Sequence, residues 1–154
     1  MNTGFKSNLI CVGMIAMLLT CVFSVTAQAK QVYQTRVKVV HASKGPAHVD
    51  PGIQDVVREI KPVFQYSRFK LVNQKSMSLP QGKQGVMSLP GQRQLVITPQ
   101  GKKGKRIQYH IRINSKGSPI FQTGVRLKNN GSVTIGGPKV KKGVLLINIQ
   151  GSTR

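Results

Sequence analysis

Acidic side chains are almost absent from this chain. Its 154 residues include 24 Lys and Arg but only three Asp and Glu, at Asp50, Asp55 and Glu59, so the formal net charge is +21. Ordinary surfaces intersperse both signs, because like charges repel one another. So few carboxylates leave little material for paired-carboxylate catalysis. The excess of cations instead favours association with anionic partners.

Cysteine and aromatic residues are scarce as well. Both cysteines, Cys11 and Cys21, lie within the first 29 residues, and tryptophan is absent. The remainder of the chain therefore lacks thiol nucleophiles, thiolate zinc ligands and attachment sites for c-type haem. Five Phe and three Tyr in the whole chain are few for a platform on which nucleic-acid bases would stack.

Residues 1–29 have the layout of a secretory signal peptide. A lysine precedes an apolar run over residues 9–25, and Ala27-Gln28-Ala29 offers the small-x-small pattern that signal peptidase accepts. An uncleaved membrane anchor and a lipoprotein modified at the second cysteine are the alternatives. We expect cleavage at the site marked by Ala27 and Ala29. This predicts an exported protein, periplasmic or extracellular, with no transmembrane segment after cleavage.

Alternation of polar and apolar residues dominates the rest of the chain. In residues 107–113, Ile and Tyr alternate with Gln, His and Arg, which is the period of a strand with one buried face. Similar patterns or short apolar runs occupy residues 32–40, 66–73, 94–98, 121–128, 133–135 and 144–149. Residues 30–154 therefore predict a single basic domain that is mainly β (α+β). We expect an antiparallel meander or small sandwich of about six to eight strands with one amphipathic helix.

The amphipathic helix is expected near residues 51–64. Asp50 would cap it, and Pro51 suits the first helical position. Its apolar face would comprise Ile53, Val56, Val57, Ile60 and Phe64. Asp55 and Glu59 lie four residues apart near the positive helix N-terminus, so helix stabilisation explains these acids. A paired-carboxylate catalytic site is the alternative.

Two turn signals stand between expected strands. Residues 77–84 (MSLPQGKQ) recur as residues 87–94 (MSLPGQRQ), and Pro and Gly punctuate both copies. Two copies are too few for a repeat fold, so we expect two similar turns. Asn130-Gly131 is the usual signal for a two-residue hairpin.

Cations fall mainly on the polar sides of the expected strands and in two turns. The candidate anion-binding residues are Arg36, Lys38, Arg68, Lys70, Lys102, Lys103, Lys105, Arg106, Arg112, Arg126, Lys128, Lys139, Lys141 and Lys142. An exposed sheet face is polar in any protein, but that does not explain the missing acids. We expect these cations to form one contiguous positive region in the folded protein.

No motif in the chain predicts catalysis. The three histidines lack metal-ligand spacing. His48 lies near Asp50 and Ser43, but proximity in sequence is not the geometry of a catalytic triad. Gly136-Gly137-Pro138 lacks the ending of a phosphate-binding loop. We therefore expect no enzymatic activity, no metal site and no cofactor.

Two segments resemble bacterial exported proteins. Residues 131–137 (GSVTIGG), followed by residues 143–147 (GVLLI), resemble the IGG hairpin of secretins. Residues 49–69 are similar to a segment of small exported bacterial β-rich proteins of unassigned function. The chain is far shorter than a secretin. The resemblance implies an accessory protein of the cell envelope rather than a pore, and it assigns no functional residue.

These observations predict an exported, non-enzymatic binding or assembly module whose basic surface engages polyanionic components of the cell envelope. The expected partner is an anionic envelope polymer, lipid headgroups or an acidic protein, and extracellular DNA is a further candidate because phosphates attract cations. Adaptation to the surrounding medium would also explain the charge. The alternative function is that of a structural or accessory subunit of an envelope or extracellular assembly, joined through exposed strand edges.

Overall fold

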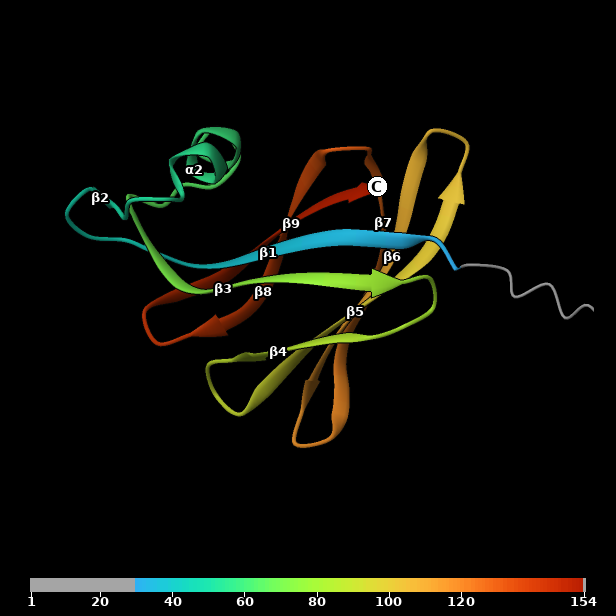
Figure 1. Ribbon diagram of the computed structural model, residues 1–154. Coiled ribbons are helices and arrows are strands. Elements are labelled where there is room, and N and C mark those ends of the chain that lie inside the picture. The colour runs from blue at the N-terminus through green and yellow to red at the C-terminus, as the bar shows by residue number, and fades with distance from the viewer. Residues whose placement is uncertain (1–29, 154) are drawn as a thin grey trace, which may run out of the picture.

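The computed structural model describes residues 30–153 (Figure 1). The expected signal peptide and its cleavage residues, Ala27 and Ala29, lie outside this range. The described residues are mainly β, as expected, with nine strands and one short helix. In chain order these are β1 (Val32–Ser43), β2 (His48–Val49), α2 (Gln54–Ile60), β3 (Arg68–Pro80), β4 (Gly85–Leu89), β5 (Arg93–Lys103), β6 (Arg106–Ser115), β7 (Ser118–Lys128), β8 (Gly131–Val140) and β9 (Gly143–Thr153).

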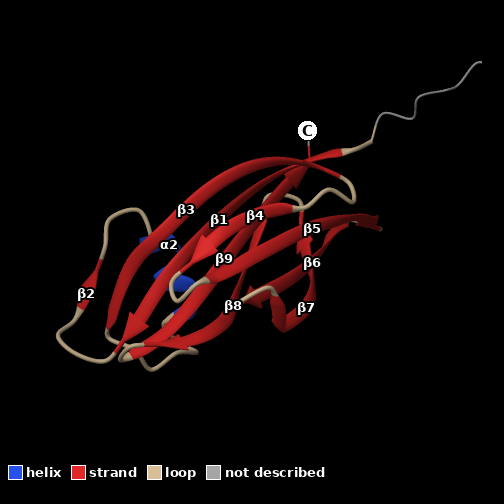
Figure 2. Cartoon of the chain, turned by 90° about the horizontal axis from the view of Figure 1, so that it is seen from below, coloured by secondary structure: helices blue, strands red, loops and turns tan. Residues whose placement is uncertain are grey.

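The strands form two sheets that pack against each other, seen as adjacent layers in Figure 2. One sheet has the order β2-β3-β1-β9-β8, and the other is a meander in the order β4-β5-β6-β7. Neighbouring strands run antiparallel except for the short β2, which is parallel to β3. In the five-stranded sheet, β1 lies between β3 and β9, so the first and last strands of the domain are partners. The fold is therefore a small sandwich.

Tight turns connect strands of different sheets as well as partners within one sheet. The expectation of a paired hairpin at Asn130-Gly131 is wrong, because β7 and β8 belong to different sheets. Asn130 still makes the turn, with φ +62°, a left-handed conformation that Asn tolerates. Both copies of the near-repeat contain a turn, as expected, with positive φ at Gly82 after β3 and at Gly91 after β4. The two turns differ, because the first connects the two sheets and the second joins the paired strands β4 and β5.

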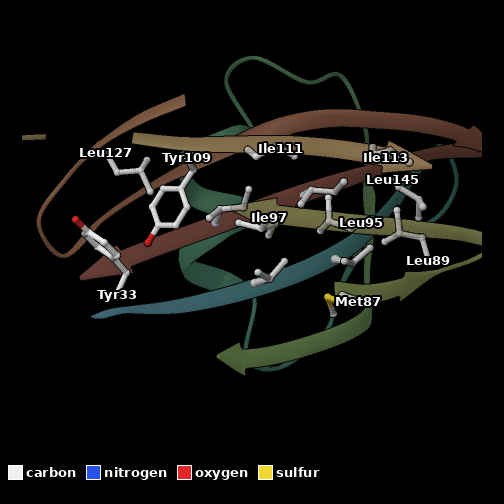
Figure 3. Close-up of a cluster of buried hydrophobic side chains, with 14 of the residues drawn as sticks. Tyr33, Met87, Leu89, Leu95, Ile97, Tyr109, Ile111, Ile113, Leu127 and Leu145 are labelled. Atoms are coloured by element: carbon white, nitrogen blue, oxygen red, sulfur yellow. The ribbon is translucent and has the colours of Figure 1, made fainter. Parts of the chain in front are cut away.

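The main core lies between the inner faces of the two sheets (Figure 3). Its buried residues are Tyr33, Val37, Val39, Met87, Leu89, Leu95, Ile97, Ile107, Tyr109, Ile111, Ile113, Leu127, Leu145, Ile147 and Ile149. Tyr33 and Tyr109 meet edge to face, with ring centroids 6.4 Å apart, and the Tyr109 and Thr35 hydroxyls are hydrogen-bonded at 3.0 Å. A Cβ at Gly151 would lie 2.6 Å from the Tyr109 hydroxyl. Only glycine leaves room for the tyrosine there.

A second, smaller core lies on the outer face of the five-stranded sheet, where α2 covers one end (Figure 1). Its members are Val40, Ala42, Ile53, Val56, Val57, Ile60, Phe69 and Leu146. Strand β9 is therefore buried on both faces: Leu145 and Ile147 face the main core, and Leu146 faces α2. This double burial explains the uniformly apolar run in residues 144–149, because a strand covered on both sides need not alternate.

The helix lies within the expected range, near residues 51–64, but it is shorter and begins differently. It spans Gln54–Ile60, and its N-cap residue is Ile53, with no side-chain cap bond. The expected cap at Asp50 is wrong. Pro51 and Gly52 form a turn before the helix, and Gly52 has φ +84°, which is incompatible with a right-handed helical turn.

Candidate anion-binding surfaces

Eleven of the fourteen candidate cations lie at the two ends of the sandwich, and Arg36, Lys38 and Arg112 lie elsewhere. The β5–β6 end carries Lys102, Lys103, Lys105, Arg106, Arg126 and Lys128. The β8–β9 end carries Arg68, Lys70, Lys139, Lys141 and Lys142. Strand β5 runs between the ends, from Arg93 beside Lys139 to Lys103, a length of about 30 Å. The cations thus form two separate groups and not the single contiguous region expected from the sequence.

A row of three cations crosses the β5–β6 end. Lys103 is directly opposite Arg106, which is directly opposite Lys128 on its other side. Ile107 and Leu127 alternate with this row and point into the main core, so the row lies on the outer face of the four-stranded sheet. We call Lys103, Arg106 and Lys128 the basic row. Like charges directly opposite each other destabilise a sheet, and no acidic residue occurs in β5, β6 or β7.

Two further cations of the four-stranded sheet lie on the same outer face as the basic row. Arg126 is opposite Gln108, one step along the sheet from the row. Arg112 lies further along β6, between Val96 and Gln122, and its Nε is buried with no hydrogen-bond partner within residues 30–153. The basic row therefore has one close cationic neighbour, Arg126, and Arg112 stands apart.

Lys38 is held by α2. Its Nζ donates to Asp55 Oδ2 at 2.9 Å and to the Gly52 carbonyl at 2.8 Å, and its side chain is 12 % exposed. Burial raises the pKa of the Asp55 carboxyl, but the hydrogen bonds from Lys38 and from the Val56 amide, with the Lys38 charge, outweigh this. The net pKa lies below its ordinary value of 3.8. Lys38 therefore anchors the helix and leaves its charge largely compensated.

Arg36 lies on the same outer face but away from the helix. It is exposed and borders a hollow of about 210 Å³ whose other lining residues are Gln34, Thr35, Ser76, Asn130, Gln150 and Ser152. The hollow is lined by amides and hydroxyls, and Arg36 is its one charged residue. This surface has a single cation, so it offers less to a polyanion than either end of the sandwich.

A recess opens at the β8–β9 end between the β4–β5 turn and the β8–β9 hairpin. Its volume is about 700 Å³. Basic side chains line it, namely His41, Lys70, Arg93, Lys139 and Lys141, and apolar residues form much of the remaining wall, namely Leu71, Val72, Pro90, Val140 and Leu145. We call this hollow the β8–β9 recess. It contains no acidic residue.

The sequence analysis missed two residues of this recess, His41 and Arg93. A signal for Arg93 was present in the alternation: it shares the inward register of Leu95 and Ile97, both of which are core residues. An arginine at an inward position of a strand is uncommon, because burying a charge is costly unless it is paired. The patterning alone therefore marks Arg93 as a residue whose position needs an explanation.

The His48 and Asp50 side chains, which suggested a triad with Ser43, have a structural role. His48 Nε2 and Asp50 Oδ1 are 2.8 Å apart, and Asp50 Oδ2 accepts a hydrogen bond from the Leu71 amide at 2.9 Å. The bond from His48 is the main cause that lowers the pKa of Asp50. Within residues 30–153, no hydrogen bond joins Ser43 to His48. The pair therefore fastens the loop before α2 to β3.

Among residues 30–153 no group of three His, Cys, Asp or Glu side chains is placed to hold a metal ion. In the same range, no helix is both long and apolar enough to cross a membrane. Comparisons with protein-family models, curated proteins and solved structures found no match to this chain. The chemistry of the two ends is therefore the evidence that bears on function.

Proposed function

We propose that this protein is an exported, non-enzymatic binding module that holds polyanionic components of the cell envelope on the basic row. The observation that supports this most directly is the unbroken cross-strand alignment of Lys103, Arg106 and Lys128. Such an alignment costs stability in the free protein. A ligand with closely spaced phosphates or carboxylates removes that repulsion when it binds, so the cost becomes part of the affinity.

The geometry of the basic row suits an extended polymer or a cluster of headgroups. Neighbouring strands lie about 4.8 Å apart, so the three charges are spread over roughly 10 Å on an open sheet face. Arg126 adds a fourth cation beside the row. Phosphate-bearing lipopolysaccharide, acidic polysaccharide and anionic headgroups all present charges at such intervals. Extracellular DNA has the same phosphate chemistry and is one arm of the test.

The test compares two triple variants that remove the same charge from opposite ends. K103Q/R106Q/K128Q disrupts the basic row, and K139Q/K141Q/K142Q is its matched control in the β8–β9 turn. We expect the native protein to bind lipopolysaccharide, acidic polysaccharide, anionic liposomes or DNA in a salt-sensitive manner. The row variant should bind about tenfold more weakly, equivalent to about 1.4 kcal/mol, and the control should change much less.

Two outcomes would contradict the proposal. If neither the native protein nor its variants bind any of these polyanions, the basic row does not serve this function. If both triple variants lose the same affinity, binding follows net charge alone and adaptation to the surrounding medium explains the composition better.

A subunit role through β-edge pairing is the second candidate. Strand β7 is an edge of the four-stranded sheet, and its residues 118–125 carry no charge. Ile120 and Phe121 on this strand are 51 % and 38 % exposed. Natural edge strands are usually protected by charges or covering elements, so an uncharged edge with exposed apolar residues favours a partner strand. A partner retained at high salt, and lost in Phe121→Lys, would support this role over the basic row.

A further inference from the structure

The β8–β9 recess combines two properties that are seldom found together on a surface. Five basic side chains line it without a single acid, and apolar residues such as Leu71, Val140 and Leu145 form much of its wall. Its volume of about 700 Å³ falls within the roughly 300–1,000 Å³ range of small-molecule sites. A polyanion needs no apolar wall, so this recess differs chemically from the basic row.

Arg93 reaches into the recess from the four-stranded sheet. Its guanidinium lies against Gly91, where a Cβ would be 3.3 Å from Nη1, and Gly91 itself has φ +81°. Nη1 donates a long hydrogen bond of 3.5 Å to the Lys139 carbonyl, which links the two sheets at this end. Nε is buried and has no hydrogen-bond partner among residues 30–153.

His41 reaches into the same recess from the five-stranded sheet. The ring occupies space that is free because residue 143 is glycine: a Cβ at Gly143 would lie 2.6 Å from His41 Nε2. This Nε2 is also buried without a hydrogen-bond partner among the described residues. Two glycines, Gly91 and Gly143, therefore make room for two basic groups whose buried nitrogens are unsatisfied.

The cations of the recess indicate the charge of its ligand. Among the described residues, the Arg93 guanidinium donates one hydrogen bond, and that bond is long at 3.5 Å. A carboxylate or phosphate oxygen is the partner that a guanidinium N–H prefers. Lys70 and Lys141 add positive charge to the same recess. The apolar residues, Val72 and Val140 among them, then suit an alkyl chain attached to that anionic head.

We propose that the β8–β9 recess is a binding site for a dissolved single-chain amphiphilic anion, an alkyl chain that ends in a carboxylate or phosphate. Its headgroup accepts hydrogen bonds from the Arg93 guanidinium, and its chain lies along Val72, Val140 and Leu145. The site is separate from the basic row and uses none of its residues.

The test titrates the purified protein with dodecanoate and dodecyl phosphate below their micelle-forming concentrations, using calorimetry. Dodecyltrimethylammonium has the same chain with the opposite charge, and acetate has the anion without the chain. We expect one molecule of dodecanoate or dodecyl phosphate per protein, and little heat from either control. In ¹H–¹⁵N NMR spectra, the amide signals of Gly91 and Gly143 should shift, and those of Gly104 and Gly124 should not.

Two pairs of variants separate the site from the fold. Val72→Asp places a negative charge in the recess and should abolish dodecanoate binding, whereas Val86→Asp is the control at a similarly exposed valine, 41 % against 39 %. Arg93→Lys keeps the charge but loses the planar fork of guanidinium donors and should weaken binding about tenfold or more. Arg112→Lys is its control, because Arg112 Nε is equally buried and unsatisfied on the other face of the four-stranded sheet.

Several outcomes would overturn this inference. They are the absence of dodecanoate and dodecyl phosphate binding, equal binding of the cationic amphiphile, unchanged affinity in Val72→Asp, or binding only to vesicles of anionic phospholipid. The first three outcomes do not bear on the basic row, whose test uses polyanions and a different set of variants. Binding to anionic vesicles alone is a result that the basic row, and not the recess, would explain. Conversely, loss of polyanion binding in K103Q/R106Q/K128Q with unchanged dodecanoate affinity would show that the two sites are independent.

Discussion

At the β5–β6 end the cations lie in an open row on a sheet face, whereas at the β8–β9 end they surround a recess with apolar walls. The two ends carry similar charge, but their cations lie in different surroundings. An open row meets a ligand that remains in water and contributes many charges. A recess with cations and apolar walls suits a ligand that leaves water in part. Net charge alone therefore does not define the ligand.

The two ends also differ in the contacts that hold the two sheets together beneath their cations. Under the β5–β6 end, Tyr109 packs on Tyr33 and is hydrogen-bonded to Thr35 inside the main core. At the β8–β9 end, long hydrogen bonds join the sheets, from Arg93 to the Lys139 carbonyl at 3.5 Å and from Asn73 to the Ser88 carbonyl at 3.3 Å. The first end should therefore be the more rigid, and substitutions at the two ends should have unequal effects on stability.

The largest effect is expected from Tyr109→Ala. Tyr109 is 1 % exposed, so the substitution leaves a cavity and removes the edge-to-face contact with Tyr33. It also leaves the Thr35 hydroxyl without its hydrogen-bond partner. We expect a loss of about 3–5 kcal/mol in the free energy of unfolding, measured by urea denaturation. Phe121→Ala is the control, because that ring is 38 % exposed, and it should cost well under half as much. Equal losses would contradict the assignment of Tyr109 as the support of this end.

Gly143→Ala tests the β8–β9 end. A Cβ there would collide with the Ala42 carbonyl oxygen and lie 2.6 Å from His41 Nε2. We expect a loss of about 1–3 kcal/mol from overpacking, together with weaker dodecanoate binding, because the His41 ring has to move. The control is Gly136→Ala in β8, where a Cβ would meet nothing within 4 Å. Unchanged stability and affinity in Gly143→Ala would show that the ring is free to shift.

Lys128→Gln should act in the opposite direction and stabilise the fold. It removes one of the two cations directly opposite Arg106, and a cross-strand pair contributes about 0.2–1 kcal/mol. We expect the free energy of unfolding to rise by about 0.5 kcal/mol at low salt, while polyanion affinity falls. The gain should disappear at high salt, since exposed charges are then screened. A destabilised Lys128→Gln protein would argue against repulsion within the basic row.

The smallest effect on stability is expected from a fall in pH, and it concerns α2. The pKa of Asp55 is lowered in the folded protein from its ordinary 3.8. Its ionised form therefore stabilises the fold above pH 3.8, and this contribution is lost as the pH falls further, through the folded pKa. The Asp55 side chain is 70 % exposed, so the contribution is small. A lower protection factor for amide exchange in α2 below this pH, with no such fall in Asp55→Asn, is the expected observation.

The alternation of side chains predicted the strands well, because it reports which face of a strand is buried. The expectation for residues 107–113 matches β6, and the apolar run of residues 144–149 is confirmed as a central strand, β9. Alternation does not report which strand is the partner. For this reason Asn130-Gly131 suggested a hairpin, although β7 and β8 belong to different sheets.

Local sequence patterns gave wrong expectations where tertiary contacts determine the position of a side chain. Phe121 has the same period as Leu127, but β7 is an edge strand and only Leu127 is buried. Asp50 looked like a helix cap, yet the Leu71 amide and His48 hold its carboxylate instead. The cations of the two ends were visible in the sequence, but their separation was not, since it depends on how β5 aligns with β8 and β9. The recess depends on Gly91 and Gly143, which a sequence shows only as turn residues.

The pairing of β1 with β9 has a consequence for how the molecule matures. Because β1 lies between β3 and β9, the larger sheet is incomplete until residues 143–153 have left the ribosome. Contacts between segments so distant in the chain form slowly. The four-stranded sheet, whose strands lie within residues 85–128, can form earlier. In a nascent chain of this design, the larger sheet is therefore the last part of the domain to close.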